Sequence, residues 1–187
     1  KNELSKSMKI KNDLSNAQTA LECYKLYKDR APFKLKGFFR FIIFNENDSS
    51  LFVANDHLGS KPLYFVKKNN LVCISGVINN LIAFTDKKEI NFERLRDYLI
   101  YFSGKPYDTF FKHILRLPPA HFLKAVKEKF FIKKYFQFDH SQAAQNFSSE
   151  EFAYEFKKIF FNAIDSLSTR NDLIYGTALS GGLDSSA

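Results

Sequence analysis

The sequence contains no tryptophan, only two cysteines and no long apolar run, and these absences exclude several classes of protein. Two cysteines are too few for a disulfide framework, and Cys23 and Cys73 do not form a Cys-x-x-Cys pair, so both are expected to be core thiols. No apolar run reaches the about 20 residues of a membrane-spanning helix, and no secretory signal opens the chain. The sequence therefore predicts a cytoplasmic protein without a membrane partner.

The sequence also lacks a Gly-x-x-x-x-Gly-Lys-Ser/Thr motif, which excludes the most widespread phosphate-binding loop. The net charge of +8 would suit nucleic acid, but the lysines are scattered over turns and helix faces. This scatter predicts a solvated surface and no nucleic-acid partner. Lys1 rather than Met opens the chain of 187 residues, so we expect the sequence to begin inside a longer protein.

A phosphate-binding pattern is present at residues 179–186, which read Leu-Ser-Gly-Gly-Leu-Asp-Ser-Ser. The preceding residues 173–179 are apolar and partly β-branched, and predict a buried strand. Two adjacent glycines permit a tight turn that brings backbone N–H groups close to an anion. Ser180 and Ser185 add hydroxyl groups, and Asp184 adds a carboxylate where a phosphate-bound divalent cation would lie. The pattern predicts a nucleotide-phosphate site.

Capping patterns and hydrophobic periodicity predict an α/β protein with two domains. The predicted helices are 15–28, 77–83, 93–102 and 148–164, and the predicted strands are 37–44, 51–54, 63–67, 71–75, 122–126 and 130–135. Strand 37–44 is apolar throughout, so we expect both its faces to be covered. Polar residues 137–146 predict a linker that separates domain 1–137 from domain 138–187. The apolar stripe of the last helix is expected to pack on the strand that ends at Leu179.

Three motifs along the chain resemble glutamine-dependent asparagine synthetases. Residues 55–64 are similar to the family's Arg-Asp-x-x-Gly-x-Lys-Pro-Leu-Tyr, residues 92–126 contain a form of its Leu-Pro-Pro-Gly-His, and residues 179–186 match its Leu-Ser-Gly-Gly-Leu-Asp-Ser-Ser. The resemblance implies an incomplete N-terminal-nucleophile-type α/β/β/α sandwich over 1–137. It also implies that 138–187 begin an ATP-pyrophosphatase α/β domain that is truncated after its phosphate loop.

The resemblance further implies an ATP-dependent ligase that forms an amide through an acyl-adenylate. Its implied cofactors are ATP and Mg²⁺, and its implied partners are a carboxylate such as aspartate, an amine donor and a second subunit of a homodimer. The implied ATP- and pyrophosphate-binding residues are Leu179, Ser180, Gly181, Gly182, Asp184 and Ser185. Asp184 is also the implied metal ligand.

Four departures from the family pattern predict that glutaminase activity is lost. The family uses an N-terminal cysteine as nucleophile, whereas Lys1 opens this chain. Asn16 stands where the family has an aspartate that contacts the α-ammonium group of glutamine, and this exchange removes about 1.5–3 kcal/mol of binding. Asn55 and Gly76 stand where the family has arginine and glutamate.

Two alternative functions remain open at this stage. β-Lactam synthetases and lasso-peptide cyclases resemble asparagine synthetases but use an amine of the substrate itself. The second alternative is that the chain is an inactive fragment. His57 and His121 have no serine or cysteine partner in the sequence, so both are expected to be structural. Asp56 and Lys61 are expected to pair as a structural link across their loop.

Overall fold

The fold is described from a computed structural model, which covers residues 14–69, 71–85, 88–139, 147–167, 174–176 and 178–186. The chain divides into two compact units, Lys1–Gln137 and Phe138–Ala187. Within the ranges described, no helix combines the length and the apolar character needed to cross a membrane.

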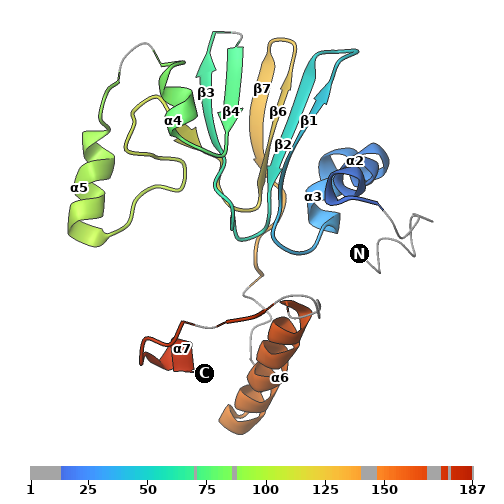
Figure 1. Ribbon diagram of the computed structural model, residues 1–187, viewed down its shortest axis with the longest axis vertical. Coiled ribbons are helices and arrows are strands. Elements are labelled where there is room, and N and C mark those ends of the chain that lie inside the picture. Colours follow the sequence, from blue (N-terminus) through green and yellow to red (C-terminus); the bar gives the residue numbers. More distant parts are fainter. Residues whose placement is uncertain are drawn as a thin grey trace. The chain divides into compact units, whose positions relative to one another are not determined.

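Two antiparallel sheets form the centre of the first unit (Figure 1). The strand order is β1-β2-β6-β7 in the four-stranded sheet and β4-β3-β5 in the three-stranded sheet. The strands are β1 (Arg40–Asn45), β2 (Ser50–Asn55), β3 (Tyr64–Lys68), β4 (Leu71–Ser75), β5 (Leu115–Arg116), β6 (His121–Val126) and β7 (Lys129–Lys134). The helices are α2 (Asn16–Tyr27), η1 (Lys28–Arg30), α3 (Ala31–Lys34), α4 (Asn79–Ile82) and α5 (Phe92–Tyr101). The predicted hairpins are confirmed as β3–β4 and β6–β7.

Side-chain caps begin two helices of this unit where the sequence predicts them. Ser15 Oγ accepts a hydrogen bond from Gln18 N at 3.2 Å, and Gln18 Oε1 accepts one from Ser15 N at 2.8 Å. Asn91 Oδ1 accepts from Arg94 N at 3.1 Å and caps α5. Such caps satisfy N–H groups that have no partner within the helix, and each contributes about 1 kcal/mol.

The inner faces of the two sheets share the main core. Val53 of β2 and Leu123 of β6 are both 1% exposed, and they pack with Leu63, Phe65 and Leu117 from the side of the three-stranded sheet. Burial of such side chains contributes about 1.5–3 kcal/mol each, so this contact holds the sheets face to face.

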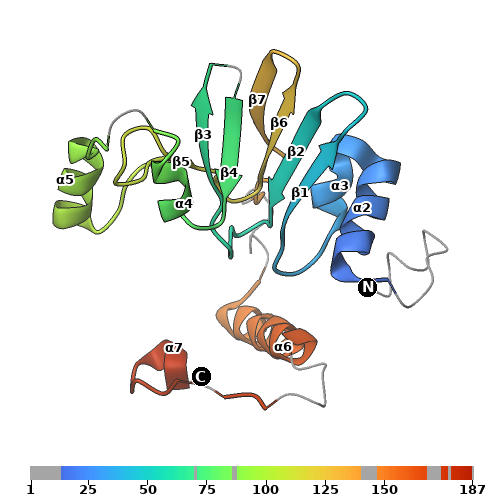
Figure 2. The same ribbon diagram turned by 45° about the horizontal axis from the view of Figure 1, so that its top comes forward.

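Helices cover the two outer faces (Figure 2). Cys23 of α2 is buried and packs with Phe41 of β1, against the four-stranded sheet. Leu81 of α4 is 2% exposed and packs with Val66 of β3, on the three-stranded sheet. These layers confirm the predicted α/β/β/α sandwich.

Strand β1 contradicts the prediction that both its faces are covered. Phe41 and Ile43 pack on the outer face with the residues beneath α2. Ile42 and Phe44, which alternate with them, are 49% and 58% exposed. Ile42 pairs with Val53, so the exposed side chains lie on the inner face of the sheet. The prediction is wrong for this face because the three-stranded sheet is one strand narrower and does not reach over β1.

Several short elements were not predicted, among them β5 and α3. Strand β5 contains only Leu115–Arg116, and it pairs with Tyr64 and Phe65 of β3. Helix α3 is a single turn with Pro32 as its second residue. Elements of this length are too short to show hydrophobic periodicity in the sequence.

Ala120 has a strained backbone that can be relieved by substitution. Its φ is +58°, and its side chain is 4% exposed. The left-handed conformation costs a residue with a Cβ about 1–2 kcal/mol, while glycine adds about 0.5–1 kcal/mol of unfolded-state entropy. We expect Ala120→Gly to raise the free energy of unfolding by about 0.5–1 kcal/mol, measured by urea denaturation.

The matched control for this prediction is Ala54→Gly. Ala54 is fully buried in the central strand β2 and pairs with Phe41, so its replacement by glycine should lower the free energy of unfolding. A decrease for Ala120→Gly as well would show that packing of the Ala120 methyl group outweighs its backbone strain.

The second unit contains α6 (Ser149–Leu167) and α7 (Leu183–Ser186). Helix α6 begins as predicted, because Glu151 accepts from Ser148 N at 2.8 Å and Glu151 N donates to Ser148 Oγ at 3.3 Å. Its apolar stripe is exposed, with Phe152 at 53% and Ile159 at 66%. The expected packing of this stripe on a strand is therefore wrong for the described residues.

The strand predicted at 173–179 does not form in the described part of that segment, which is residues 174–176, 178 and 179. Ile174 is 102% exposed and Leu179 is 73% exposed, so the prediction of a buried strand is wrong here. A strand satisfies its backbone N–H and C=O groups by pairing with a neighbour, and the described residues of this unit provide none.

Candidate functional site

Ser180 and Ser185 meet across the loop that the sequence predicts to bind phosphate. Their Oγ atoms lie 3.0 Å apart, and Ser180 N donates to Ser185 Oγ at 3.2 Å. Ser185 Oγ also lies 3.0 Å from Gly182 O, to which it can donate. Gly181 has a φ of +77°, which residues with a Cβ rarely adopt. Hydrogen bonds between the two serines and to Gly182 O therefore join the start and the end of the loop. The sequence pattern identifies these hydroxyl groups but does not show that they are in contact.

Asp184 supplies a single carboxylate beside these hydroxyls. It lies in α7, which is one turn long, and it is exposed. Across the residues that the structure describes, no group of three or more His, Cys, Asp or Glu side chains is placed to hold a metal ion. A lone carboxylate fits Mg²⁺ better than a metal held by protein ligands alone, since Mg²⁺ keeps several water and phosphate ligands.

The loop offers hydroxyl and backbone N–H groups, which are donors of the kind that bind phosphate anions. Serine hydroxyls rotate freely, so an anion can replace the hydrogen bonds that Ser180 and Ser185 make to each other and to Gly182 O. Residues 178–186 contain no lysine or arginine, so the loop offers neutral donors and one carboxylate. Such a site binds a metal-complexed phosphate better than a bare one, because the cation offsets the charge of Asp184.

Three of the four positions that depart from the asparagine synthetase pattern lie among the described residues, and two of these three have structural contacts. Asn16 is the first residue of α2 and is exposed. Asn55 is fully buried and donates from Nδ2 to Leu117 O at 2.8 Å, while its Oδ1 has no hydrogen-bond partner. At Gly76 the space that a side chain would occupy is filled by the guanidinium group of Arg40. Asn55 and Gly76 therefore serve packing in this unit.

Asp56 fastens the loop that follows β2. Its carboxylate is 2% exposed and accepts from Phe39 N at 3.2 Å, Leu58 N at 3.0 Å, and both the backbone N and the hydroxyl of Ser60 at 3.2 Å. The structural role predicted for Asp56 is confirmed, but the expected partner Lys61 is wrong. The backbone N–H groups of Phe39, Leu58 and Ser60 lie within hydrogen-bond distance of the carboxylate, so it accepts from them and not from the lysine side chain.

The structure also gives structural positions to both histidines. The His57 ring contacts the edges or faces of Tyr135 and Phe136, with ring centres 5.4 Å and 4.7 Å away. The His121 ring donates from Nδ1 to Pro119 O at 2.6 Å. Burial lowers the pKa of His57, and the neighbouring Asp56 carboxylate only partly opposes this effect.

The lowered pKa of His57 makes stability depend on pH. As the pH falls below about 6.5, the unfolded chain binds a proton on this ring before the folded chain does, so the free energy of unfolding decreases. We expect the decrease to be smaller in His57→Gln, which cannot titrate. Urea denaturation of both proteins between pH 5 and pH 8 measures the difference, and parallel curves would contradict the prediction.

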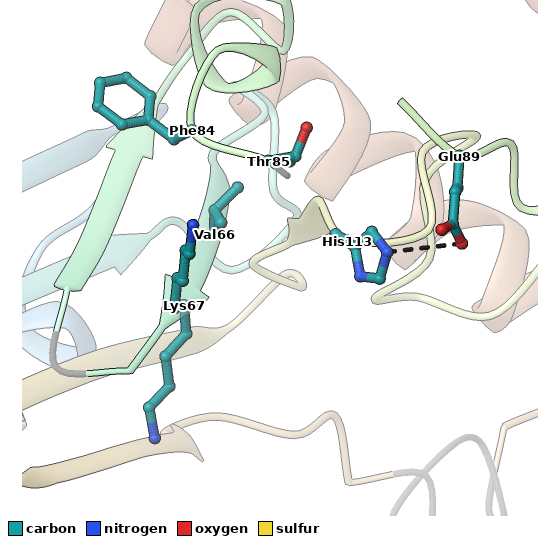
Figure 3. A pocket seen from close by; sticks show the side chains of 7 residues that line it. Val66, Lys67, Phe84, Thr85, Glu89 and His113 are labelled. Atoms are coloured by element: carbon teal, nitrogen blue, oxygen red, sulfur yellow. Dashed lines mark ion pairs between the residues drawn. The ribbon is translucent and has the colours of Figure 1, made fainter. Parts of the chain in front are cut away.

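A shallow pocket in the first unit was not predicted (Figure 3). Its volume is about 350 Å³, and it is lined by Val66, Lys67, Lys68, Phe84, Thr85, Glu89 and His113. The Glu89 carboxylate lies 3.2 Å from Lys112 Nζ and 3.7 Å from His113 Nε2. In Figure 3 the Lys67 side chain points away from Glu89 and His113. None of its polar lining residues is buried. We assign it no role in the function.

Comparison with known proteins identifies the first unit. Residues 1–136 match the glutamine amidotransferase domain, over nearly three quarters of the chain. The chain belongs to this family. Its two facing sheets are the frame of the amidotransferase domain, and Asn16, Asn55 and Gly76 all lie within the matched residues.

The relatives of the whole chain include asparagine synthetases. Asparagine synthetase [glutamine-hydrolyzing] 1 of Bacillus subtilis is 29% identical over 177 residues, which cover 94% of this chain and 27% of that protein. A putative glutamine-hydrolyzing asparagine synthetase of Methanocaldococcus jannaschii is 27% identical over 157 residues, which cover 82% of this chain and 30% of that protein. An amidase of Penicillium rubens is also 27% identical, and the matched region is 26% of that protein. The chain thus spans less than a third of each relative.

Proposed function

We propose that this chain is part of an ATP-dependent enzyme that forms an amide in the manner of asparagine synthetases. One observation carries the proposal. The amidotransferase match ends at residue 136, whereas the similarity to the Bacillus subtilis synthetase extends over 177 residues. The similarity therefore continues into the second unit, which contains the loop at 179–186. Domains 1–137 and 138–187 would be an amidotransferase domain and the start of an ATP-pyrophosphatase domain.

The proposed reaction has two steps. A substrate carboxylate such as aspartate attacks the α-phosphate of ATP, which gives an acyl-adenylate and releases pyrophosphate. An amine then attacks the acyl carbon and displaces AMP. In this proposal the loop binds the pyrophosphate group through Leu179, Ser180, Gly181, Gly182, Asp184 and Ser185. Mg²⁺ bound at Asp184 would neutralise the leaving group, and the loop hydroxyls would orient it.

We further propose that the amidotransferase domain of this chain does not hydrolyse glutamine. Asn55 is held inside the domain by its bond to Leu117 O, and Arg40 occupies the space beside Gly76. Asn16 has a neutral amide where the family pattern has a carboxylate for the glutamine α-ammonium group. The enzyme would then use free ammonia or an amine of its substrate. We place it in the cytoplasm, as a homodimer.

A second candidate follows from the same departures. If the amine belongs to the substrate, as in β-lactam synthetases and lasso-peptide cyclases, ammonia is not needed and a glutamine site has no use. The uncharged side chains at Asn16 and Asn55 favour this version, while the similarity to two asparagine synthetases favours the first.

Product analysis distinguishes these functions. The protein that carries this chain together with a complete synthetase domain is incubated with ATP, Mg²⁺ and aspartate, with either ammonium or glutamine. We expect asparagine and AMP from ammonium and none from glutamine. Asparagine from glutamine would overturn the loss of glutaminase activity, and no asparagine from either source would leave the intramolecular ligase as the better candidate.

A further inference from the structure

We propose that residues 135–137, the exit segment of the first unit, form a pH-sensitive switch in which neutral His57 holds Phe136 and protonated His57 releases it. The first unit ends at Gln137, so the exit segment is its last part before the chain continues into the second unit. Release would move the start of the connecting chain from Phe138 to Tyr135. Each released residue would add up to about 3.3–3.6 Å to the reach of that connection.

The exit segment is bound to the first unit beyond the end of the sheet. Strand β7 ends at Lys134, and the next residue, Tyr135, makes two hydrogen bonds. Its backbone N donates to Ala120 O at 2.8 Å, and its hydroxyl donates to Asn55 O at 2.6 Å. Burial raises the pKa of the Tyr135 hydroxyl, with a smaller contribution from the Asp56 carboxylate, so this donor stays protonated at neutral and acidic pH.

The ring of Phe136 packs against two elements that are distant in the sequence. Its centre lies 6.3 Å from that of Phe33 in α3 and 4.7 Å from that of His57 in the loop after β2. The His57 ring also lies 5.4 Å from the ring of Tyr135, and it stands nearly perpendicular to both rings of the exit segment. His57 therefore contacts two successive side chains of the exit segment and makes the nearer of the two ring contacts to Phe136.

The surroundings of His57 oppose its protonation in this closed arrangement. Burial lowers the pKa of the ring, and the Asp56 carboxylate opposes this effect only in part, since it already accepts hydrogen bonds from backbone N–H groups. The other charged or titratable groups on the elements around the exit segment are Tyr135, Lys34 of α3, Lys134 of β7 and His121 of β6. None of these four is a carboxylate, so a protonated His57 is more stable where water surrounds it.

The direction of the switch follows from this difference between the closed and the open state. In the open state His57 is hydrated and takes up a proton near its ordinary pKa of about 6.5. In the closed state it takes up the proton only at a lower pH. Opening of the exit segment therefore becomes more favourable as the pH falls below about 6.5, and it is independent of pH above that value.

Amide hydrogen exchange of Tyr135, measured by NMR on the full 187-residue chain, reports this opening because its N–H donates to Ala120 O. We expect its protection factor, corrected for the intrinsic exchange rate, to fall about threefold or more between pH 8 and pH 5. Urea below the unfolding transition should not change this factor, because a local opening exposes little surface, but it should lower the protection of Leu123 in the core. An equal response of both amides to urea would overturn the proposal, since the exit segment would then open only with the whole unit.

Two histidine variants identify the titrating group. His57→Gln should make the protection of Tyr135 independent of pH, whereas His121→Gln, which removes the other histidine near the exit segment, should keep the pH dependence. A pH dependence that survives in His57→Gln or disappears in His121→Gln would contradict the assignment to His57. A rise in protection on acidification would show that attraction of the protonated ring to Tyr135 and Phe136 outweighs its burial, and would also overturn the proposal.

Two phenylalanine variants test the contact through which His57 acts. Phe136→Ala should lower the protection of Tyr135 at pH 8, because the ring that His57 contacts is gone. Phe131→Ala, in β7 and at a side chain that is 40% exposed, is the matched control and should leave this protection unchanged. Circular dichroism confirms that both variants fold. Equal protection of Tyr135 in the two variants would show that the Phe136 ring does not hold the exit segment.

Discussion

Replacing Asp184 by alanine should reduce ATP–pyrophosphate exchange about 100-fold or more in the protein that carries this chain with a complete synthetase domain. Asp184 is the single carboxylate of residues 178–186, and it lies beside the paired hydroxyls of Ser180 and Ser185. Without it, Mg²⁺ at the leaving pyrophosphate would lose its proposed protein ligand. Radiolabelled pyrophosphate incorporated into ATP in the presence of the carboxylate substrate measures the effect.

Asp165→Ala is the matched control for this experiment. Asp165 is also exposed and belongs to the same unit, but it lies in α6 and outside the loop. Its substitution should leave exchange unchanged. Full exchange activity in Asp184→Ala would remove the loop from the mechanism, and an equal loss in both variants would point to a general effect of charge on the second unit.

Asp56→Ala should have the largest effect on the stability of the first unit, lowering its free energy of unfolding by about 3 kcal/mol or more. The buried carboxylate accepts hydrogen bonds from three backbone N–H groups, those of Phe39, Leu58 and Ser60. Alanine would remove the acceptor that these three donors share, at a position that is 2% exposed. Urea denaturation followed by circular dichroism measures the change.

Asp48→Ala controls for the loss of a turn carboxylate as such. Asp48 accepts from Ser50 N at 3.0 Å in the β1–β2 turn, but it is exposed, so water can replace it. The unfolding midpoint of Asp48→Ala should match that of the unsubstituted chain. If Asp56→Ala also kept this midpoint, the carboxylate would not be what fastens the loop after β2.

Local patterns in the sequence predicted the local structure well. Ser15 and Asn91 cap their helices as expected, because a cap depends on residues three positions apart and needs no information from the rest of the fold. The β3–β4 and β6–β7 hairpins are confirmed for the same reason, since each joins neighbouring segments through a short turn.

Features that depend on distant partners were predicted less well. Residues 173–179 have the composition of a buried strand, yet Ile174 and Leu179 are exposed because composition does not provide a neighbouring strand. Strand β5 forms because Leu115 lies opposite Phe65, a pairing that no local pattern shows. The apolar sequence of β1 predicted cover on both faces, and the structure supplies it on one, since the strand's own sequence does not show how far the opposite sheet extends.

In the candidate site, too, the sequence predicted some features and not others. Motif resemblance selected Ser180, Asp184 and Ser185, and their roles in binding phosphate stay predictions. The contact between the two serine hydroxyls became visible only in three dimensions. The amide of Asn55 likewise gave no sign in the sequence that it would be buried against Leu117 O.

The pairing of β2 with β6 has a consequence for how fast the amidotransferase domain folds. Asn55 donates to Leu117 O across 62 positions of the sequence, and Val53 pairs with Leu123 beside it. The chain must close this long loop before the core between the sheets can form. Loop closure lowers the conformational entropy before the contacts that offset this cost have formed. The β3–β4 and β6–β7 hairpins can form within microseconds, whereas we expect the complete sandwich to need milliseconds to seconds. Destabilising the β2–β6 contact should therefore slow refolding more than it speeds unfolding.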